Sequence, residues 1–360
     1  MKRPEMTNRE RILNALNFRE TDRLPWAPLI DGYFIQSLPL QNIHMDIIEA
    51  MRYIGCDIME RHVAKPVTEV TNVERRVEQA SDGKSYRIWY ETPVGAVFEE
   101  RRHTGETDYI SRHLVETLED VKVYRYIIEH EMFRDNIAAF LERDHYIGDD
   151  GIAVTGGPMS PIQRLLQRDA GVENTVYLME DYPEEMDALL EAMHETNKKA
   201  YHVLKEYPTE VIFAYEDTSS TVMSRDMFVN YSAPAIDDYA RILHSGGKKF
   251  ITHMCGRLNA FKSEIGAGIQ DGVDSVCPPF TGDLHIWEAR RAWGNGKLLI
   301  GGIDPPALSR MRVAECEQTV REIWDHMKDQ RGFILSTGDA VPFGTPIENL
   351  IAITRLVAQL

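Results

Sequence analysis

Histidine, cysteine and acidic residues recur at the ends of predicted strands in the C-terminal half of the chain. His253 and Cys255 come at the end of one predicted strand, Cys277 at the end of the next, and Asp339 at the end of the last. At a strand end the chain leaves regular geometry, so residues two apart can both face one pocket. Imidazole, thiolate and carboxylate are ligands that zinc accepts in tetrahedral geometry. The pattern predicts a metal site with these four residues as candidate ligands.

Each of these residue types has a simpler interpretation. An isolated His or Cys is more often a buried structural residue, and Cys277 is alternatively a small buried hydrophobe. The strand that precedes the His253 strand ends in Tyr215-Glu216-Asp217, which we treat as candidate substrate-binding residues. Glu216 is alternatively a structural residue at the strand end. Asp31 is a further substrate-binding candidate, although an Asp before a Gly is as often a turn residue.

The elements that position these residues alternate between strands and helices. Short β-branched runs end in Gly, Pro or polar residues, and amphipathic stretches follow them, which is typical of βα units and a parallel sheet. The expected strands include residues 24–30, 210–215, 249–253, 275–277, 298–302 and 332–336. Roughly eight strands over this length favour a closed (β/α)8 TIM barrel, whose active site lies where the strands end. A doubly wound sheet is the alternative, but no Gly-x-Gly-x-x-Gly follows the first strand.

Helix signals complete this pattern. Helices are expected near residues 8–16, 44–54, 131–143, 183–204 and 234–244, and after residue 345. The first has a capping box of Thr7 and Glu10, and the last begins with a second predicted box at Thr345, followed by Pro346. The helix at 234–244 should stop at two glycines.

One region departs from the alternation. Residues 66–112 alternate between apolar and polar side chains on either side of the turn 92–95, which predicts an antiparallel hairpin. We expect it to be an excursion from the barrel, so that residues 1–360 form a single domain.

Composition and charge narrow the range of expected functions. The chain has 360 residues and a formal net charge of −17, so nucleic-acid and anionic-membrane binding are not expected. The N-terminus has no apolar region of a signal peptide, and no apolar run is long enough to span a bilayer. Four widely spaced cysteines do not form a disulfide framework. These features predict a cytoplasmic protein with reduced thiols.

The sequence resembles a known superfamily over almost its whole length. Residues 249–283 read KFITHMCGRLNAFKSEIGAGIQDGVDSVCPPFTGD, which is similar to uroporphyrinogen decarboxylases, and specifically to their zinc-dependent, corrinoid-linked methyltransferase branch. Residues 7–25, 301–304 and 336–349 match other blocks of the superfamily. The decarboxylases carry an Arg-Gln-Ala-Gly-Arg element after the first strand, and residues 26–33 here read WAPLIDGY without an arginine.

The resemblance also places the metal ligands. His253 and Cys255 match the first two ligands of the methyltransferases, whose third is usually a Cys in a Gly-Cys segment near the C-terminus. Here Asp339 follows Gly338 at that place, which is a departure. This departure has three interpretations. Asp339 is a carboxylate ligand and Cys277 supplies the second thiolate, or Asp339 lies beside the ligands without binding the metal. In the third, the protein has lost the metal.

The resemblance implies a cofactor and a partner. Such enzymes move a methyl group to or from cobalamin held on a small separate corrinoid protein, which would dock at the open end of the barrel. A carboxylate in place of a thiolate makes zinc a harder acid, which favours a methoxy-type donor over a thiol acceptor. The alternatives are a metal-independent decarboxylase and a barrel that binds a corrinoid protein without catalysis. For the oligomeric state of the protein, a homodimer is one alternative.

Overall fold

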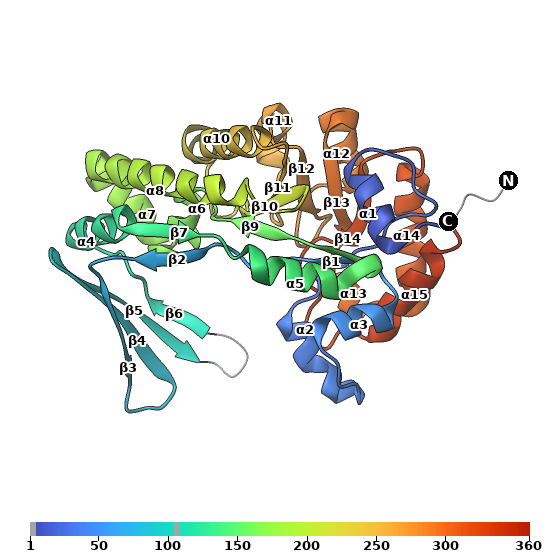
Figure 1. Cartoon of the computed structure of the whole chain (residues 1–360), viewed down its shortest axis with the longest axis horizontal. Coiled ribbons are helices and arrows are strands. Elements are labelled where there is room, and N and C mark those ends of the chain that lie inside the picture. Colours follow the sequence, from blue (N-terminus) through green and yellow to red (C-terminus); the bar gives the residue numbers. More distant parts are fainter. Residues whose placement is uncertain (1–4, 104–107) are drawn as a thin grey trace.

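A parallel sheet of six strands forms the centre of the molecule (Figure 1), in the order β9-β10-β11-β12-β13-β14. The computed structural model describes residues 5–103 and 108–360. The first four residues, part of the expected leaderless N-terminus, and residues 104–107 of the expected excursion lie outside the described residues. The strands are β9 Thr155–Gly157, β10 Val211–Tyr215, β11 Lys249–His253, β12 Gly272–Val276, β13 Leu298–Ile303 and β14 Phe333–Thr337.

Shorter segments continue the parallel arrangement beyond both edges of this sheet. Strand β8 (Gly151–Ala153) precedes β9 directly and pairs in parallel with β1 (Ile58–Glu60). At the other edge, Trp26 forms a parallel bridge with Leu335 of β14. The carbonyl oxygen of Trp26 also accepts a hydrogen bond of 2.8 Å from the N–H of Asp57, just before β1. Backbone hydrogen bonds therefore connect β14 to the segment at Trp26, and they connect Trp26 to the residue just before β1.

The expected strand at residues 24–30 is wrong in its extent. Only the bridge at Trp26 forms within it. Pro25 and Pro28 flank this residue, and a proline has no N–H to donate to a neighbouring strand. The predicted position is correct, but the prolines limit regular pairing to one residue.

Helices follow the strands, and several of them pack along the outside of the sheet (Figure 1). Helix α8 contacts β9, α10 contacts β11, and both α12 and α14 contact β13. The helices are α1 Asn8–Leu16, α2 Gly32–Ser37, α3 Ile47–Ile54, α4 Leu118–Glu129, α5 Ile137–Ile147, α6 Pro161–Arg164, α7 Gly171–Asp181, α8 Pro183–Leu204, α9 Arg225–Met227, α10 Ala233–His244, α11 Lys262–Ala267, α12 Ile286–Trp293, α13 Pro305–Arg310, α14 Val313–Met327 and α15 Ile347–Val357. Among the described residues, no helix combines the length and the apolar character that crossing a bilayer requires.

Both faces of the central strands are buried, as expected for a parallel sheet. In β10, Val211 and Phe213 join one apolar cluster while Ile212 and Ala214 join another, and all four are fully buried. The cluster with Val211 and Phe213 takes its other members from α1, from the segment at Trp26 and from strands β1, β8, β11, β13 and β14. Residues of α1 therefore belong to the same apolar cluster as side chains from one face of these strands.

Two antiparallel sheets extend from this body (Figure 1, left), and the larger one lies at the lower left. A four-stranded sheet contains β3 Glu74–Gln79, β4 Ser85–Thr92, β5 Gly95–His103 and β6 Asp108–Arg112, which confirms an antiparallel excursion with a turn near residues 92–95. A smaller sheet pairs β2 (Val67–Val70) with β7 (Glu131–Arg134). The expected helix at 131–143 is therefore wrong in its first part, because residues 131–134 pair with a strand more than 60 positions away.

The two predicted capping boxes differ in outcome. At α1, the Thr7 side chain accepts from the N–H of Glu10, and the Glu10 side chain accepts from the N–H of Thr7, so this box is confirmed. At α15, the hydroxyl of Thr345 donates to the carbonyl oxygen of Pro342 instead, and the helix begins without a side-chain cap. The second box is therefore wrong. The stop after α10 is confirmed, because Gly247 adopts a φ of +71° there.

Candidate metal centre

The register of three neighbouring strands brings the candidate residues together. Tyr215 of β10 pairs with His253 of β11, and His253 pairs with Asp274 of β12. Immediately beyond this row, the N–H groups of Glu216 and Asp217 each donate to the carbonyl oxygen of His253 at 3.0 Å. Asp217 takes a positive φ of 41°, a strained conformation that is common at functional sites. The sheet thereby fixes Asp217 beside the end of β11.

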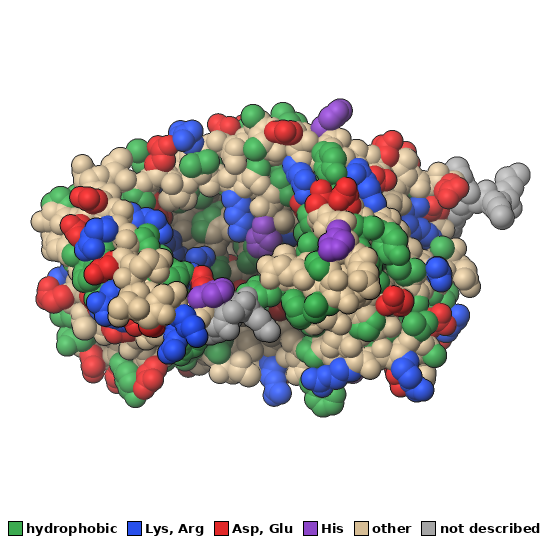
Figure 2. Space-filling model, turned by 90° about the horizontal axis from the view of Figure 1, so that it is seen from below, with side chains coloured by type: hydrophobic (Ala, Val, Ile, Leu, Met, Phe, Trp, Pro, Cys, Tyr) green, Lys and Arg blue, Asp and Glu red, His purple; other side chains and the backbone are tan. Residues whose placement is uncertain are grey.

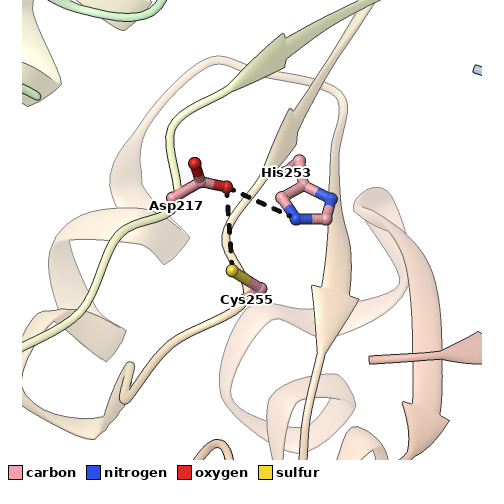
Figure 3. Close-up of side chains that lie close together, drawn as sticks. All are labelled: Asp217, His253 and Cys255. Carbon is pink, nitrogen blue, oxygen red and sulfur yellow. Dashed lines mark hydrogen bonds and ion pairs between the residues drawn. The ribbon is translucent and has the colours of Figure 1, made fainter. Parts of the chain in front are cut away.

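Asp217, His253 and Cys255 form a compact donor cluster (Figure 3), in which one potential ligand atom of each lies within 4.8 Å of the others. Asp217 Oδ1 is 3.5 Å from His253 Nε2 and 3.7 Å from Cys255 Sγ. The structure thus joins the predicted His-x-Cys pair to a residue that we expected to bind substrate. One oxygen, one nitrogen and one sulfur donor make a set that suits zinc.

Buried partners orient His253 toward this cluster. Its Nδ1–H donates to Asp274 Oδ2 at 2.7 Å, and Ser275 Oγ lies 3.0 Å from the same nitrogen. The other oxygen of Asp274 forms an ion pair of 3.0 Å with Arg61, and both of these side chains are at most 1% exposed. A carboxylate behind the imidazole is the usual arrangement of a metal-binding histidine, and it leaves Nε2 for the metal.

The pKa values of the cluster show how strongly its groups interact. Burial lowers the pKa of His253, but the hydrogen bond and charge of Asp274 outweigh burial and hold this pKa above its ordinary value. Burial, followed by the charges of Asp339 and Asp217, raises the pKa of the Cys255 thiol. Ionised together, the thiolate and the carboxylates would repel one another. A divalent cation would offset that repulsion, so the donor set fits a metal in charge as well as in geometry.

The two remaining predicted ligands take different positions. Asp339 Oδ1 is 3.9 Å from His253 Nε2, at the border of the cluster. Cys277 lies outside the group of three, with its Sγ 3.8 Å from Asp304 Oδ2. A Cβ on Gly338 would meet this sulfur at 2.5 Å, so Gly338 packs directly on the thiol. Burial and the nearby Asp304 raise the pKa of Cys277 to about 12.

The candidate substrate-binding residues are also dispersed. Glu216 is completely buried, and its carboxylate accepts hydrogen bonds of 2.7 and 2.6 Å from the N–H and hydroxyl of Ser160. Burial raises its pKa to about 7. Asp31 caps α2 by accepting from the N–H groups of Tyr33 and Phe34. Of these candidates, Tyr215 and Asp217 lie at the cluster, and the contacts of Glu216 and Asp31 are made elsewhere.

Sequence reasoning missed several residues that contact this site. Arg61 and His62 follow the very short strand β1, and Asp274 lies within the buried strand β12. The His62 ring stacks on Tyr215 with 3.6 Å between centroids. Burial, together with the charge of Lys65, lowers the pKa of His62 to about 3. A basic residue and a histidine directly after Ile58-Met59-Glu60 were the available signal, but β1 is too short to be recognised as a strand.

Comparison with known proteins identifies the family. Residues 112–360 match the model of the uroporphyrinogen decarboxylase (URO-D) family, and the chain therefore belongs to it. A methylated-thiol–coenzyme M methyltransferase from Methanosarcina mazei is 26% identical over 187 residues, which are 52% of this chain and 48% of that protein. The match thus spans about half the length of this relative.

A solved structure supports the same fold. A methyltransferase from Methanosarcina mazei superimposes with a TM-score of 0.65 over 99% of both chains, at 15% sequence identity. This likeness concerns the fold, because identity at that level does not carry activity from one protein to another.

Proposed function

We propose that this protein is a zinc-dependent methyltransferase that moves a methyl group between a small substrate and a corrinoid on a separate protein. The observation that carries the proposal is the donor cluster, in which oxygen, nitrogen and sulfur lie within 4.8 Å of one another. The name of the relative from Methanosarcina mazei supports methyl transfer as the reaction class.

The distances favour a different third ligand from the one that the sequence predicted. Asp217, His253 and Cys255 would hold the metal, because they already lie together. Asp339, 3.9 Å from the imidazole, would border the fourth position, where a catalytic zinc site accepts water or substrate. Cys277 would stay outside, since its thiol is directed to Asp304.

Bound zinc would act as a Lewis acid that stabilises negative charge on the atom that gives up or receives the methyl group. Asp274 would hold the imidazole in one orientation, and the stacked His62 and Tyr215 rings would restrict water near the cluster. One or two carboxylates beside a single thiolate make a harder acid than two thiolates do. This ligand set favours a methoxy donor, as the sequence also suggested.

The proposal includes the architecture. The hydrogen bonds of Trp26 to Leu335 and Asp57 support a closed (β/α)8 barrel in which eight parallel segments form the ring and residues 1–360 form one domain. The donor cluster would then lie at the carboxyl ends of the strands, the active face of such barrels. A corrinoid protein would dock at that face.

Metal analysis with matched cysteine variants tests the proposal. We expect about one zinc per chain in the wild type, because three such ligands are enough for a catalytic zinc site. Cys255→Ala and Asp217→Asn should lose the zinc, whereas Cys277→Ala and the distant control Cys316→Ala should keep it. Methylation of cob(I)alamin by methoxy compounds, followed by absorbance, then tests the reaction.

The outcomes separate the alternatives. Zinc retention by Asp217→Asn together with zinc loss by Cys277→Ala would refute the ligand assignment while leaving a metal enzyme. A wild type that takes up no zinc after reconstitution and turns over uroporphyrinogen would establish the metal-independent decarboxylase. Tight binding of a corrinoid protein without any turnover would establish the non-catalytic alternative.

A further inference from the structure

Two basic side chains without an acidic partner line a pocket next to the donor cluster. Lys65 and Arg168 lie on the wall of this pocket, which has a volume of about 270 Å³ and also contains Tyr215. Within residues 5–103 and 108–360, neither basic side chain forms an ion pair. A third basic residue on the same wall, Arg164, pairs with Asp169 at 2.7 Å and, at 3.5 Å, with Glu131, the carboxylate that lines the pocket. The pocket therefore carries two unpaired positive charges.

Tyr215 connects this pocket to the cluster. The Lys65 ammonium lies 5.3 Å from the centroid of the Tyr215 ring, and the His253 ring centroid lies 5.3 Å from the same ring. Arg168 belongs to a π-helical turn, Leu165–Asp169, and such turns often occur at functional sites. The side chain of Gln167 in this turn donates to the carbonyl oxygen of Asp217 at 3.4 Å. The Tyr215 ring thus lies between Lys65 and His253, and the turn that carries Arg168 contacts the backbone of Asp217.

The charge of the pocket differs from that of the whole chain. The protein carries a formal net charge of −17, so most of its surface repels anions. Figure 2 shows a hollow on one face of the molecule with basic and histidine side chains on its walls. Burial, followed by repulsion from Arg168, lowers the pKa of Lys65. Two neighbouring cations that repel each other would gain most from a bound anion.

We propose that the substrate carries an anionic group, a carboxylate or one of equal charge, that binds to Lys65 and Arg168 while its methyl-bearing end reaches the donor cluster. A pocket of about 270 Å³ suits a small acid. The role of the methyl-bearing end rests on the proposed function, whereas the binding of the anionic group requires only the two cations.

A matched pair of ligands tests this inference. Calorimetry would compare 3-methoxypropanoate with 3-methoxypropanamide, which has nearly the same shape but no charge. Hydrogen bonds to charged groups change affinity by about 10-fold or more, so the wild type should bind the acid at least about 10-fold more tightly. Lys65→Gln and Arg168→Gln should each remove most of this preference, and added salt should weaken it. Lys328→Gln, a substitution of an exposed lysine elsewhere, should leave the preference unchanged.

The inference would be overturned if the wild type bound neither ligand, or bound the acid and the amide equally. It would also be overturned if Lys65→Gln and Arg168→Gln both kept the full preference for the acid while their circular dichroism spectra showed a native fold. Titrations of zinc-loaded and EDTA-treated protein separate this failure from failure of the proposed function. A preference for the acid in a protein that takes up no zinc would remove the methyltransferase and keep the anion site. Zinc uptake and methyl transfer without any preference for the acid would keep the methyltransferase and remove the anion site.

Discussion

Asp274→Asn should weaken zinc binding and destabilise the fold for two separate reasons. The carboxylate accepts the His253 Nδ1–H at 2.7 Å and pairs with Arg61 at 3.0 Å, and none of these three side chains is more than 3% exposed. Loss of a carboxylate behind a metal-binding histidine typically costs about 10–100-fold in metal affinity. Leaving a buried arginine without its partner costs about 3–5 kcal/mol of stability.

A double variant separates these two effects. Arg61→Met combined with Asp274→Asn removes the unpaired buried charge, so the free energy of unfolding should recover most of the loss, as it does when other buried ion pairs are replaced. The zinc affinity should stay low, because the imidazole still lacks its carboxylate. Urea unfolding of the metal-free protein measures the first quantity, and competition with a chromogenic chelator measures the second.

Two outcomes would refute this reasoning. An unchanged zinc affinity in Asp274→Asn would mean that the carboxylate does not orient a metal ligand. Recovery of zinc affinity along with stability in the double variant would mean that affinity follows the integrity of the fold and not the orientation of His253.

Two further predictions concern stability. Burial raises the pKa of Asp22, but hydrogen bonds from Arg11 and a backbone N–H outweigh burial and hold this pKa at about 2. Because this value lies below the unfolded value, the pair should contribute about 2 kcal/mol at neutral pH and lose that contribution as pH falls from about 4 to about 2. Urea unfolding of wild type and Asp22→Asn at pH 7 and at pH 3 checks it, and a difference that does not shrink in acid contradicts it. Gly157→Ala should cost about 1–3 kcal/mol, because its Cβ would lie 2.5 Å from the buried Tyr201 ring. Thermal unfolding checks this, with Gly296→Ala, which meets nothing within 4 Å, as the control; equal losses in both variants would contradict it.

Local patterns were enough to predict much of the fold. The sequence predicted the capping box at Thr7 and the stop at Gly247, because each depends on residues close together in the chain. The prediction of a helix was wrong at residues 131–134, because these residues form a strand that pairs with β2, which is distant in the sequence. Local propensity does not contain such long-range pairing.

The site was harder to predict than the fold for the same reason. Asp274 stands in the middle of an apolar strand, and only the register between β11 and β12 places it behind His253. The proximity of Asp217 to Cys255 depends on a positive φ that neighbouring residues in the sequence do not indicate, so the sequence did not place Asp217 among the candidate ligands. Residues brought together by register and by unusual backbone angles are visible only in three dimensions.

The hydrogen bonds around Trp26 impose an order on assembly during synthesis. The neighbouring carbonyl oxygen of Ala27 accepts from the Ser336 hydroxyl across 309 positions of sequence. The N-terminal segment therefore emerges from the ribosome long before the strand that it must join. Contacts of such separation form slowly, because a long loop must close first. Asp217, His253 and Cys255 all precede β14 in the chain. All three residues of the donor cluster are therefore synthesised before the strand that the N-terminal segment must join.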